Sequence, residues 1–120
     1  MMANPPDWTT ESAWAGTRPP VGEAAALPAE AYADDSFYRL EQDRVFGTSW
    51  VCVGTADKVA PGGRALVRAV GGRSVVVLRN EVGELRCFSN SCRHRGTELL
   101  EMDCDLGTTI RCPYHRWTYD

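Results

Sequence analysis

The sequence has no long hydrophobic run and no block of like charges, and these two absences exclude several functions. The run Val75 to Leu78 is typical of its apolar stretches and is far shorter than the roughly 20 residues of a membrane-spanning helix. The net charge of −3 comes from interspersed acids and bases, so there is neither a basic nucleic-acid footprint nor a membrane-surface patch. We therefore expect no membrane partner and no nucleic-acid partner.

The first residues also lack the features of a secretory signal, because residues 1–7 contain no base and the first base is Arg18. A cytoplasmic location is the default expectation. The chain has five cysteines, an odd number that argues against a framework of disulfides. In a reducing compartment, cysteines close to histidines indicate metal ligation instead.

What the chain does contain divides it into three regions. Residues 1–30 are rich in Pro and Ala without helical or strand periodicity, and we expect a flexible tail. Residues 31–48 form a helical lead-in, with a helix predicted at roughly 35–46. Gly47 stands where that helix would end. The residues that can cap its start are Asp34, Asp35 and Ser36, and its shared face comprises Phe37, Leu40, Arg44 and Val45.

Residues 49–120 have the short β-branched runs and turn residues of an antiparallel meander. The expected strands cover residues 50–53, 65–70, 74–78 and 84–88. The expected turns are Pro61-Gly62-Gly63, Gly71-Gly72 and residues 80–83.

After Phe88 the periodicity stops, and the region is expected to be mostly loop. A short strand is predicted at 109–111, and another begins at Trp117. We expect this last strand to lack a partner, which would be a poor place for a sheet to stop. The domain is therefore expected to be incomplete, in a truncated chain.

Two loops in this region contain both histidines of the chain. The first loop reads Cys92-Arg93-His94 and the second reads Cys112-Pro113-Tyr114-His115. Two thiolates and two imidazoles can bind a structural zinc ion or a two-iron cluster. Zinc modules commonly pair Cys with Cys and His with His, whereas here each loop supplies one of each. This spacing favours a cluster clamped between the two loops.

With their flanking residues, these motifs resemble the N-terminal Rieske domain in the α subunits of ring-hydroxylating, Rieske-type non-haem iron oxygenases. The resemblance covers roughly residues 30–120. It implies a mainly β, Rieske-type antiparallel fold with two cluster-binding loops, preceded by a short N-terminal helix. By this resemblance, Cys92 and Cys112 would bind one iron of a Rieske-type [2Fe–2S] cluster, and His94 and His115 the other.

The resemblance also implies roles for residues around the cluster. Backbone amides around Arg95, Gly96 and residues 114–117 would donate to the cluster sulfurs, and Gly96 would let the first loop pack closely. Arg93, Arg95 and Arg116 are either solvated surface charges or contacts for an acidic electron donor.

The implied function is electron transfer, within the α subunit of an aromatic ring-hydroxylating dioxygenase or a related monooxygenase. Those enzymes activate dioxygen at a mononuclear Fe(II), held by two His and a carboxylate in a C-terminal domain. Because both histidines of this chain are already assigned to the cluster, we expect no catalytic residue here and no activity from this chain alone. The implied partners are a reductase or ferredoxin and the catalytic domain, in a homotrimer or an α/β hexamer.

Two alternatives stay open, a stand-alone electron carrier of the Rieske ferredoxin type and a structural Cys2His2 zinc module. Respiratory-chain Rieske proteins link their two loops by a disulfide between extra cysteines, at the positions where this chain has Thr97 and Tyr114. They also carry a serine two residues after the second histidine, where this chain has Trp117. We therefore expect a midpoint potential near the low end of the Rieske range, around −150 mV.

The remaining cysteines and tryptophans have structural interpretations. Cys52 and Cys87 are expected to be small buried residues in strands. Cys104 is expected to be a loop thiol without function. Trp50 and Trp117 are expected to be core aromatics.

Overall fold

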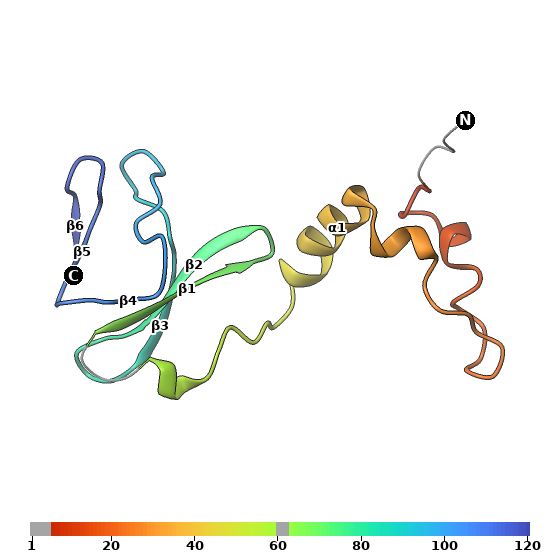
Figure 1. Ribbon diagram of the computed structural model, residues 1–120, viewed down its shortest axis with the longest axis horizontal. Helices are drawn as coiled ribbons and strands as arrows, with labels where there is room; N and C mark the ends of the chain where they lie inside the picture. The colour runs from red at the N-terminus through yellow and green to blue at the C-terminus, as the bar shows by residue number, and fades with distance from the viewer. Residues whose placement is uncertain (1–5, 60–62) are drawn as a thin grey trace.

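The computed structural model describes residues 6–59 and 63–120. Its main body is a sheet with strand order β3-β2-β1-β4, and a separate two-stranded hairpin carries the C-terminus (Figure 1). The strands are β1 (Arg64–Val70), β2 (Arg73–Arg79), β3 (Leu85–Ser89), β4 (Cys104–Asp105), β5 (Ile110–Arg111) and β6 (Thr118–Tyr119). The helical segments are η1 (Glu11–Trp14), η2 (Ala29–Tyr32), α1 (Asp35–Glu41), η3 (Gln42–Phe46) and η4 (Ala56–Lys58).

The antiparallel meander β1-β2-β3 confirms the expected fold class. Leu66 lies opposite Val77 in the β1–β2 ladder, so the two side chains share a face of the sheet. Together with Val59 they form a small buried core, against which Val53 packs. The meander is therefore held by one compact apolar cluster, and the loops that follow β3 start from a fixed strand.

The turn predicted between β1 and β2 is also confirmed. Gly71 and Gly72 have φ values of 55° and 69°, which is the left-handed geometry that two-residue hairpin turns require. The turn predicted at residues 80–83 closes β2 onto β3, with the Gly83 amide donating to the Asn80 carbonyl. The expected turn at Pro61-Gly62-Gly63 lies partly outside the described residues, because only Gly63 belongs to them.

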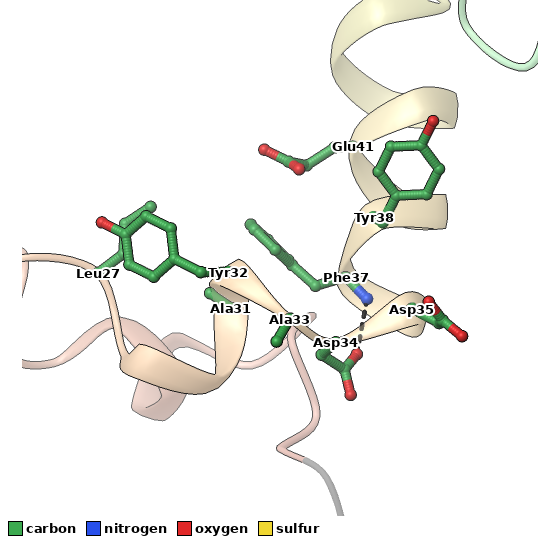
Figure 2. A pocket seen from close by; sticks show the side chains of 9 residues that line it. All are labelled: Leu27, Ala31, Tyr32, Ala33, Asp34, Asp35, Phe37, Tyr38 and Glu41. Atoms are coloured by element: carbon green, nitrogen blue, oxygen red, sulfur yellow. Dashed lines mark hydrogen bonds between the residues drawn. The ribbon is translucent and has the colours of Figure 1, made fainter.

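The predicted helix is present, as α1 followed directly by the π-helical segment η3. Asp34 caps its start, since the Asp34 carboxylate accepts a hydrogen bond of 2.8 Å from the Phe37 amide (Figure 2). Gly47 follows its end, and the Gly47 amide donates to the carbonyl of Gln42, the five-residue spacing of a π-turn. Residues 6–30, predicted to be a flexible tail, contain the buried Trp8, whose ring lies 5.5 Å from that of Trp14 and 5.0 Å from that of Phe37.

The prediction of a strand at residues 50–53 is wrong. This segment forms no ladder with another described segment; instead the Arg68 side chain donates a hydrogen bond of 3.0 Å to the Val53 carbonyl. Because the segment is not in the sheet, Trp50 and Cys52 are exposed rather than buried. Cys87 does lie in a strand but is exposed as well, since β3 is an outer strand with every residue exposed.

Three further expectations fail near the C-terminus. The strand that begins after Trp117 does have a partner, because β6 pairs with β5 in an antiparallel hairpin. Cys104 lies in β4, a strand of two residues that is too short to be recognised from periodicity. Trp117 is about half exposed and belongs to the second loop rather than to a core.

Candidate metal centre

The two sequence-predicted ligand loops have the same backbone form, although their sequences differ. In the first loop, the Cys92 amide donates to the Thr97 carbonyl and the Gly96 amide donates back to the Cys92 carbonyl, both at 2.8 Å. In the second loop, the Cys112 amide donates to the Trp117 carbonyl at 2.8 Å and the Arg116 amide donates to the Cys112 carbonyl at 3.0 Å. Each loop is therefore closed by a reciprocal pair of backbone hydrogen bonds around its cysteine.

The fifth residue of each loop, counted from its cysteine, takes a left-handed backbone conformation. Gly96 has a φ of 70° and Arg116 a φ of 62°. Within residues 6–59 and 63–120, Arg116 is the only residue other than glycine with a positive φ. Such a conformation is strained for a side chain with a Cβ, so the loop geometry is imposed on Arg116 by its surroundings.

The cysteines of the two loops are buried, and their histidines are exposed. Cys92 and Cys112 are 3% and 1% exposed. The rings of His94 and His115 lie at the surface with their centroids 4.8 Å apart and their planes at 69°. The two loops thus bring the thiols together in the interior and the imidazoles together at the surface.

The surroundings of the Cys92 thiol lower its pKa. The Tyr119 hydroxyl, 3.0 Å from the Cys92 Sγ atom, is the main reason that the pKa of Cys92 is lowered. Burial opposes this shift, while the backbone amides of His94 and Arg95 and the Cys112 side chain add to it. A cysteine binds metal as the thiolate, so these donors favour the ligand form of Cys92.

The donor set fits a two-iron cluster better than a single ion. In the part of the chain that the structure describes, no three Cys, His, Asp or Glu side chains converge as ligands of one metal ion. A structural zinc ion would need four ligands around one point, whereas each iron of a Rieske cluster takes one pair of protein ligands. A buried thiol pair and a separate imidazole pair meet that requirement.

Comparison with known proteins identifies the family of this fold. Residues 49–120 match the family model of the Rieske [2Fe-2S] domain. The chain belongs to this family. The cofactor of the family is the Rieske [2Fe–2S] cluster.

Similar proteins are oxygenase α subunits. The chain is 37% identical over 93 residues to the N,N-dimethyl phenylurea N-demethylase subunit alpha of Sphingobium sp. strain YBL2, covering 78% of this chain and 20% of that protein. It is 32% identical over 124 residues to the biphenyl 2,3-dioxygenase subunit alpha of Rhodococcus jostii strain RHA1, covering 95% of this chain and 27% of that protein.

A solved structure agrees with the sequence comparison. The quaternary ammonium Rieske monooxygenase CntA, in complex with gamma-butyrobetaine, superposes with a TM-score of 0.72 at 34% identity, over 80% of this chain and 28% of that protein. The chain thus spans only about a quarter of the length of the proteins that it matches. It corresponds to the N-terminal Rieske part of these α subunits, which pass electrons through the [2Fe–2S] cluster.

Two residues that hold the two loops in place were not found from the sequence. Tyr119 bridges them, because its hydroxyl contacts the Cys92 Sγ atom and accepts a hydrogen bond of 3.0 Å from the Arg93 amide. The same contact, first through the hydrogen bond to Cys92, raises the pKa of Tyr119. The only sequence signal was that Tyr119 falls in a short strand directly after the second loop.

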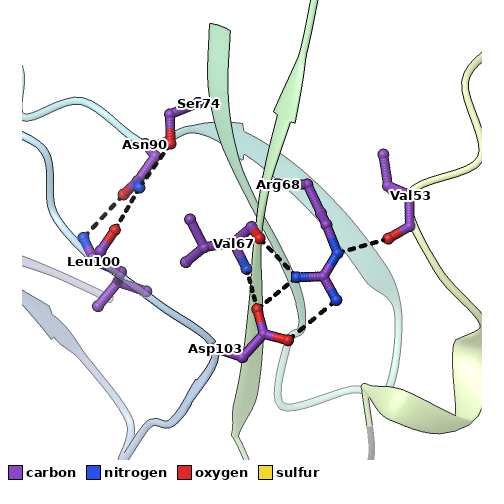
Figure 3. A network of polar contacts seen from close by, with 7 residues as sticks. All are labelled: Val53, Val67, Arg68, Ser74, Asn90, Leu100 and Asp103. Carbon is purple, nitrogen blue, oxygen red and sulfur yellow. Dashed lines mark hydrogen bonds and ion pairs between the residues drawn. The ribbon is translucent and has the colours of Figure 1, made fainter.

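Asn90 fixes the start of the first loop, and its side chain is buried with every polar atom paired (Figure 3). Its Nδ2 atom donates to Ser74 Oγ at 3.0 Å and to the Leu100 carbonyl at 2.6 Å, and also to a carboxylate oxygen of Glu98 at 3.0 Å. Its Oδ1 atom accepts from the amides of Leu99 and Leu100. Asn90 therefore ties the loop to β2, two residues before Cys92.

The remaining sequence-predicted residues lie around or away from the loops. Arg93, Arg95 and Arg116 are exposed on the loops, and none forms an ion pair with another described residue.

The groove of about 380 Å³ beside α1 lies at the other end of the molecule from the loops (Figures 1 and 2). In the described ranges, no helix is long and apolar enough to cross a membrane.

Proposed function

We propose that this chain takes up and passes on one electron at a time through a [2Fe–2S] cluster bound by Cys92, Cys112, His94 and His115. Cys92 and Cys112 would hold the inner iron as thiolates, and His94 and His115 the outer iron as imidazoles. The observation that carries the proposal is the pairing of two buried thiols and two exposed imidazoles from loops of the same form. When bound, the cluster supplies a one-electron carrier.

The chain's own residues support this use in three ways. The donors around the Cys92 Sγ atom stabilise its thiolate form. Burial of both thiols keeps water from the inner side of the site. The exposed imidazoles bring the outer side within reach of a redox partner, and Arg93, Arg95 and Arg116 are exposed on the same two loops.

We further propose that the chain acts as the electron-receiving part of an oxygenase α subunit. The oxygenases to which the similar α subunits belong are multicomponent and receive electrons from a reductase or ferredoxin. The reaction itself would occur at a mononuclear iron in another domain, in a homotrimer or an α/β hexamer. This chain alone would be inactive, because its two histidines are the proposed cluster ligands.

The free thiols of the cysteines support a reducing compartment, so we propose a cytoplasmic location. All five cysteines are free thiols in the structure, as is usual in reducing conditions.

By their names and ligands, the relatives described above act on a phenylurea, biphenyl and gamma-butyrobetaine. These three compounds share no common group.

The test is an EPR spectrum of the dithionite-reduced chain, purified without air, with iron and sulfide assayed alongside. We expect about two irons per chain and the rhombic signal of a cluster with mixed Cys and His ligands. Cys112→Ser should abolish both, while the matched variant Cys87→Ser should change neither because Cys87 lies in β3. A colourless, EPR-silent chain that contains zinc would refute the proposal.

A further inference from the structure

We propose that Trp117 is a positioning residue for His94, and that its indole clamps the first cluster loop to the second. The inference rests on the proposed cluster function and extends it to a residue that is not a ligand. The indole of Trp117 and the imidazole of His94 are stacked, with centroids 4.9 Å apart and planes 3° from parallel. This contact joins the two loops at their exposed side.

The Trp117 side of the stack is anchored by the backbone. The Trp117 carbonyl accepts the hydrogen bond from the Cys112 amide that closes the second loop. The next residue, Thr118, pairs with Arg111 in the β5–β6 ladder. The preceding residue, Arg116, takes the left-handed conformation that turns the chain into this strand. Trp117 is therefore flanked by fixed backbone on both sides.

The His94 side has no such anchor. The His94 ring is exposed and makes no hydrogen bond to another described residue. Its other aromatic neighbour is His115, whose ring lies edge-on to it. The flat contact with Trp117 is therefore what defines the plane of the His94 imidazole, whereas the ring of His115 lies 3.8 Å from that of its own neighbour Tyr114.

On this side, both loops carry positive charge. Arg93 and Arg95 extend from the first loop and Arg116 from the second, all without an ion-pair partner among the described residues. Like charges repel each other. On the buried side, the contact between Tyr119 and Cys92 holds the loops together. The stack of Trp117 on His94 supplies the matching contact at the surface.

The experiment compares Trp117→Phe with Trp117→Leu in the full chain loaded with its cluster. Phenylalanine retains a flat ring that can stack, while leucine is apolar but cannot stack. Trp50→Leu is the matched control, because Trp50 is fully exposed in the segment before η4. The readouts are the nitrogen hyperfine couplings of the reduced cluster, measured by pulsed EPR, and the rate of iron release to a chelator.

We expect the control and Trp117→Phe to keep the couplings of the wild type. In Trp117→Leu, the coupling of one histidine should broaden while that of the other stays sharp. Iron release should become faster by roughly 2- to 13-fold, the factor that corresponds to one aromatic pair. Loss of the cluster in Trp117→Leu but not in Trp117→Phe would also support the clamp.

Two outcomes would overturn the inference. In the first, Trp117→Leu has the spectrum and the iron-release rate of the wild type. In the second, Trp117→Phe loses the cluster as completely as Trp117→Leu, which would mean that Trp117 serves folding and not ring stacking. Failure of the proposed function itself is distinguishable, because the wild-type chain would then lack the mixed-ligand signal.

Discussion

The hydroxyl oxygen of Tyr119 lies 3.0 Å from the Sγ atom of Cys92, across the gap between the two loops. A hydrogen bond donated to a cysteine ligand stabilises the reduced form of a cluster, which carries the additional negative charge. Because Tyr119 comes from β6 and Cys92 from the first loop, the same contact fixes the loop spacing. The contact between Tyr119 and Cys92 therefore affects both the geometry of the site and its redox potential.

We predict that Tyr119→Phe lowers the midpoint potential of the cluster by about 20 to 60 mV, the equivalent of losing roughly 0.5–1.5 kcal/mol of hydrogen bonding to the reduced state. A redox titration followed by EPR would measure the shift. Tyr114→Phe is the control, because the Tyr114 side chain is exposed in the same site. An equal shift in both variants would mean that the contact with Cys92 does not tune the potential.

The second prediction concerns Asn90. Asn90→Asp keeps the shape of the side chain but replaces the Nδ2 donor by a carboxylate oxygen facing Glu98 and the Leu100 carbonyl. We expect a loss of roughly 3 kcal/mol or more in the free energy of unfolding at neutral pH, because a buried charge would then face other oxygens. Urea unfolding would measure it.

The effect of Asn90→Asp should weaken in acid, where the new carboxyl is protonated and can donate one hydrogen bond. The comparison variant is Asn80→Ala, which removes only hydrogen bonds within the turn between β2 and β3. Its expected cost is about 1 kcal/mol. If the two variants unfold at the same urea concentration, then the Asn90 side chain does not hold the first loop in place.

The four ligand candidates could be predicted from the sequence because their spacing is a local property. The meander was also predictable, since Gly71-Gly72 and the valines of β2 carry the turn and strand patterns in consecutive residues. Asn90 and Tyr119 could not be found in this way, because their roles depend on contacts with residues 10 and 27 positions away. The strand expected at 50–53 failed for the same reason, since β-branched residues form a strand only where a partner is available.

The third prediction is a pH dependence from Asp103. The Asp103 carboxylate accepts hydrogen bonds from the Arg68 guanidinium at 2.6 and 3.0 Å and from the Val67 amide at 2.8 Å (Figure 3). These donors, the Arg68 side chain first, lower the pKa of Asp103 below its ordinary value of 3.8. The ionised form is therefore more favourable in the folded state than in the unfolded state.

Because the folded-state pKa is depressed, this stabilisation is fully present above pH 3.8 and is lost as the pH falls through the folded-state pKa. We expect Asp103→Asn to cost about 1.5–3 kcal/mol at neutral pH and to flatten the acid limb of the stability curve. Asp105→Asn is the control, because its pair with Arg64 is 3.5 Å long and exposed. Identical acid limbs in Asp103→Asn and the wild type would contradict the assignment.

The fourth prediction compares two neighbouring glycines of the β1–β2 turn. Both have a positive φ, but a Cβ added at Gly71 would come within 2.7 Å of the Gly47 Cα atom, whereas one at Gly72 would meet nothing within 4 Å. Gly72→Ala should cost about 1 kcal/mol for the backbone strain alone. Gly71→Ala should cost a further 1–3 kcal/mol or so, because it pushes against η3. Equal unfolding midpoints would show that η3 does not rest on this turn.

The last prediction concerns Gly96, which was expected to allow close packing of the first loop. The structure gives a different reason for glycine here, because an added Cβ would meet only the Ser91 Oγ atom at 3.8 Å, an ordinary contact, while φ is 70°. Gly96→Val should therefore lose the cluster through backbone strain, since β-branched residues rarely adopt this conformation.

Gly96→Asn separates strain from packing. Asparagine is larger than alanine but tolerates the left-handed conformation, so Gly96→Asn should retain more iron than Gly96→Ala, measured as iron per chain after purification without air. Arg116→Gly, at the equivalent position of the second loop, should retain iron and raise the free energy of unfolding by about 1 kcal/mol, because it relieves the same strain. If iron content instead falls in order of side-chain size, from alanine to asparagine to valine, then packing rather than φ selects glycine at this position.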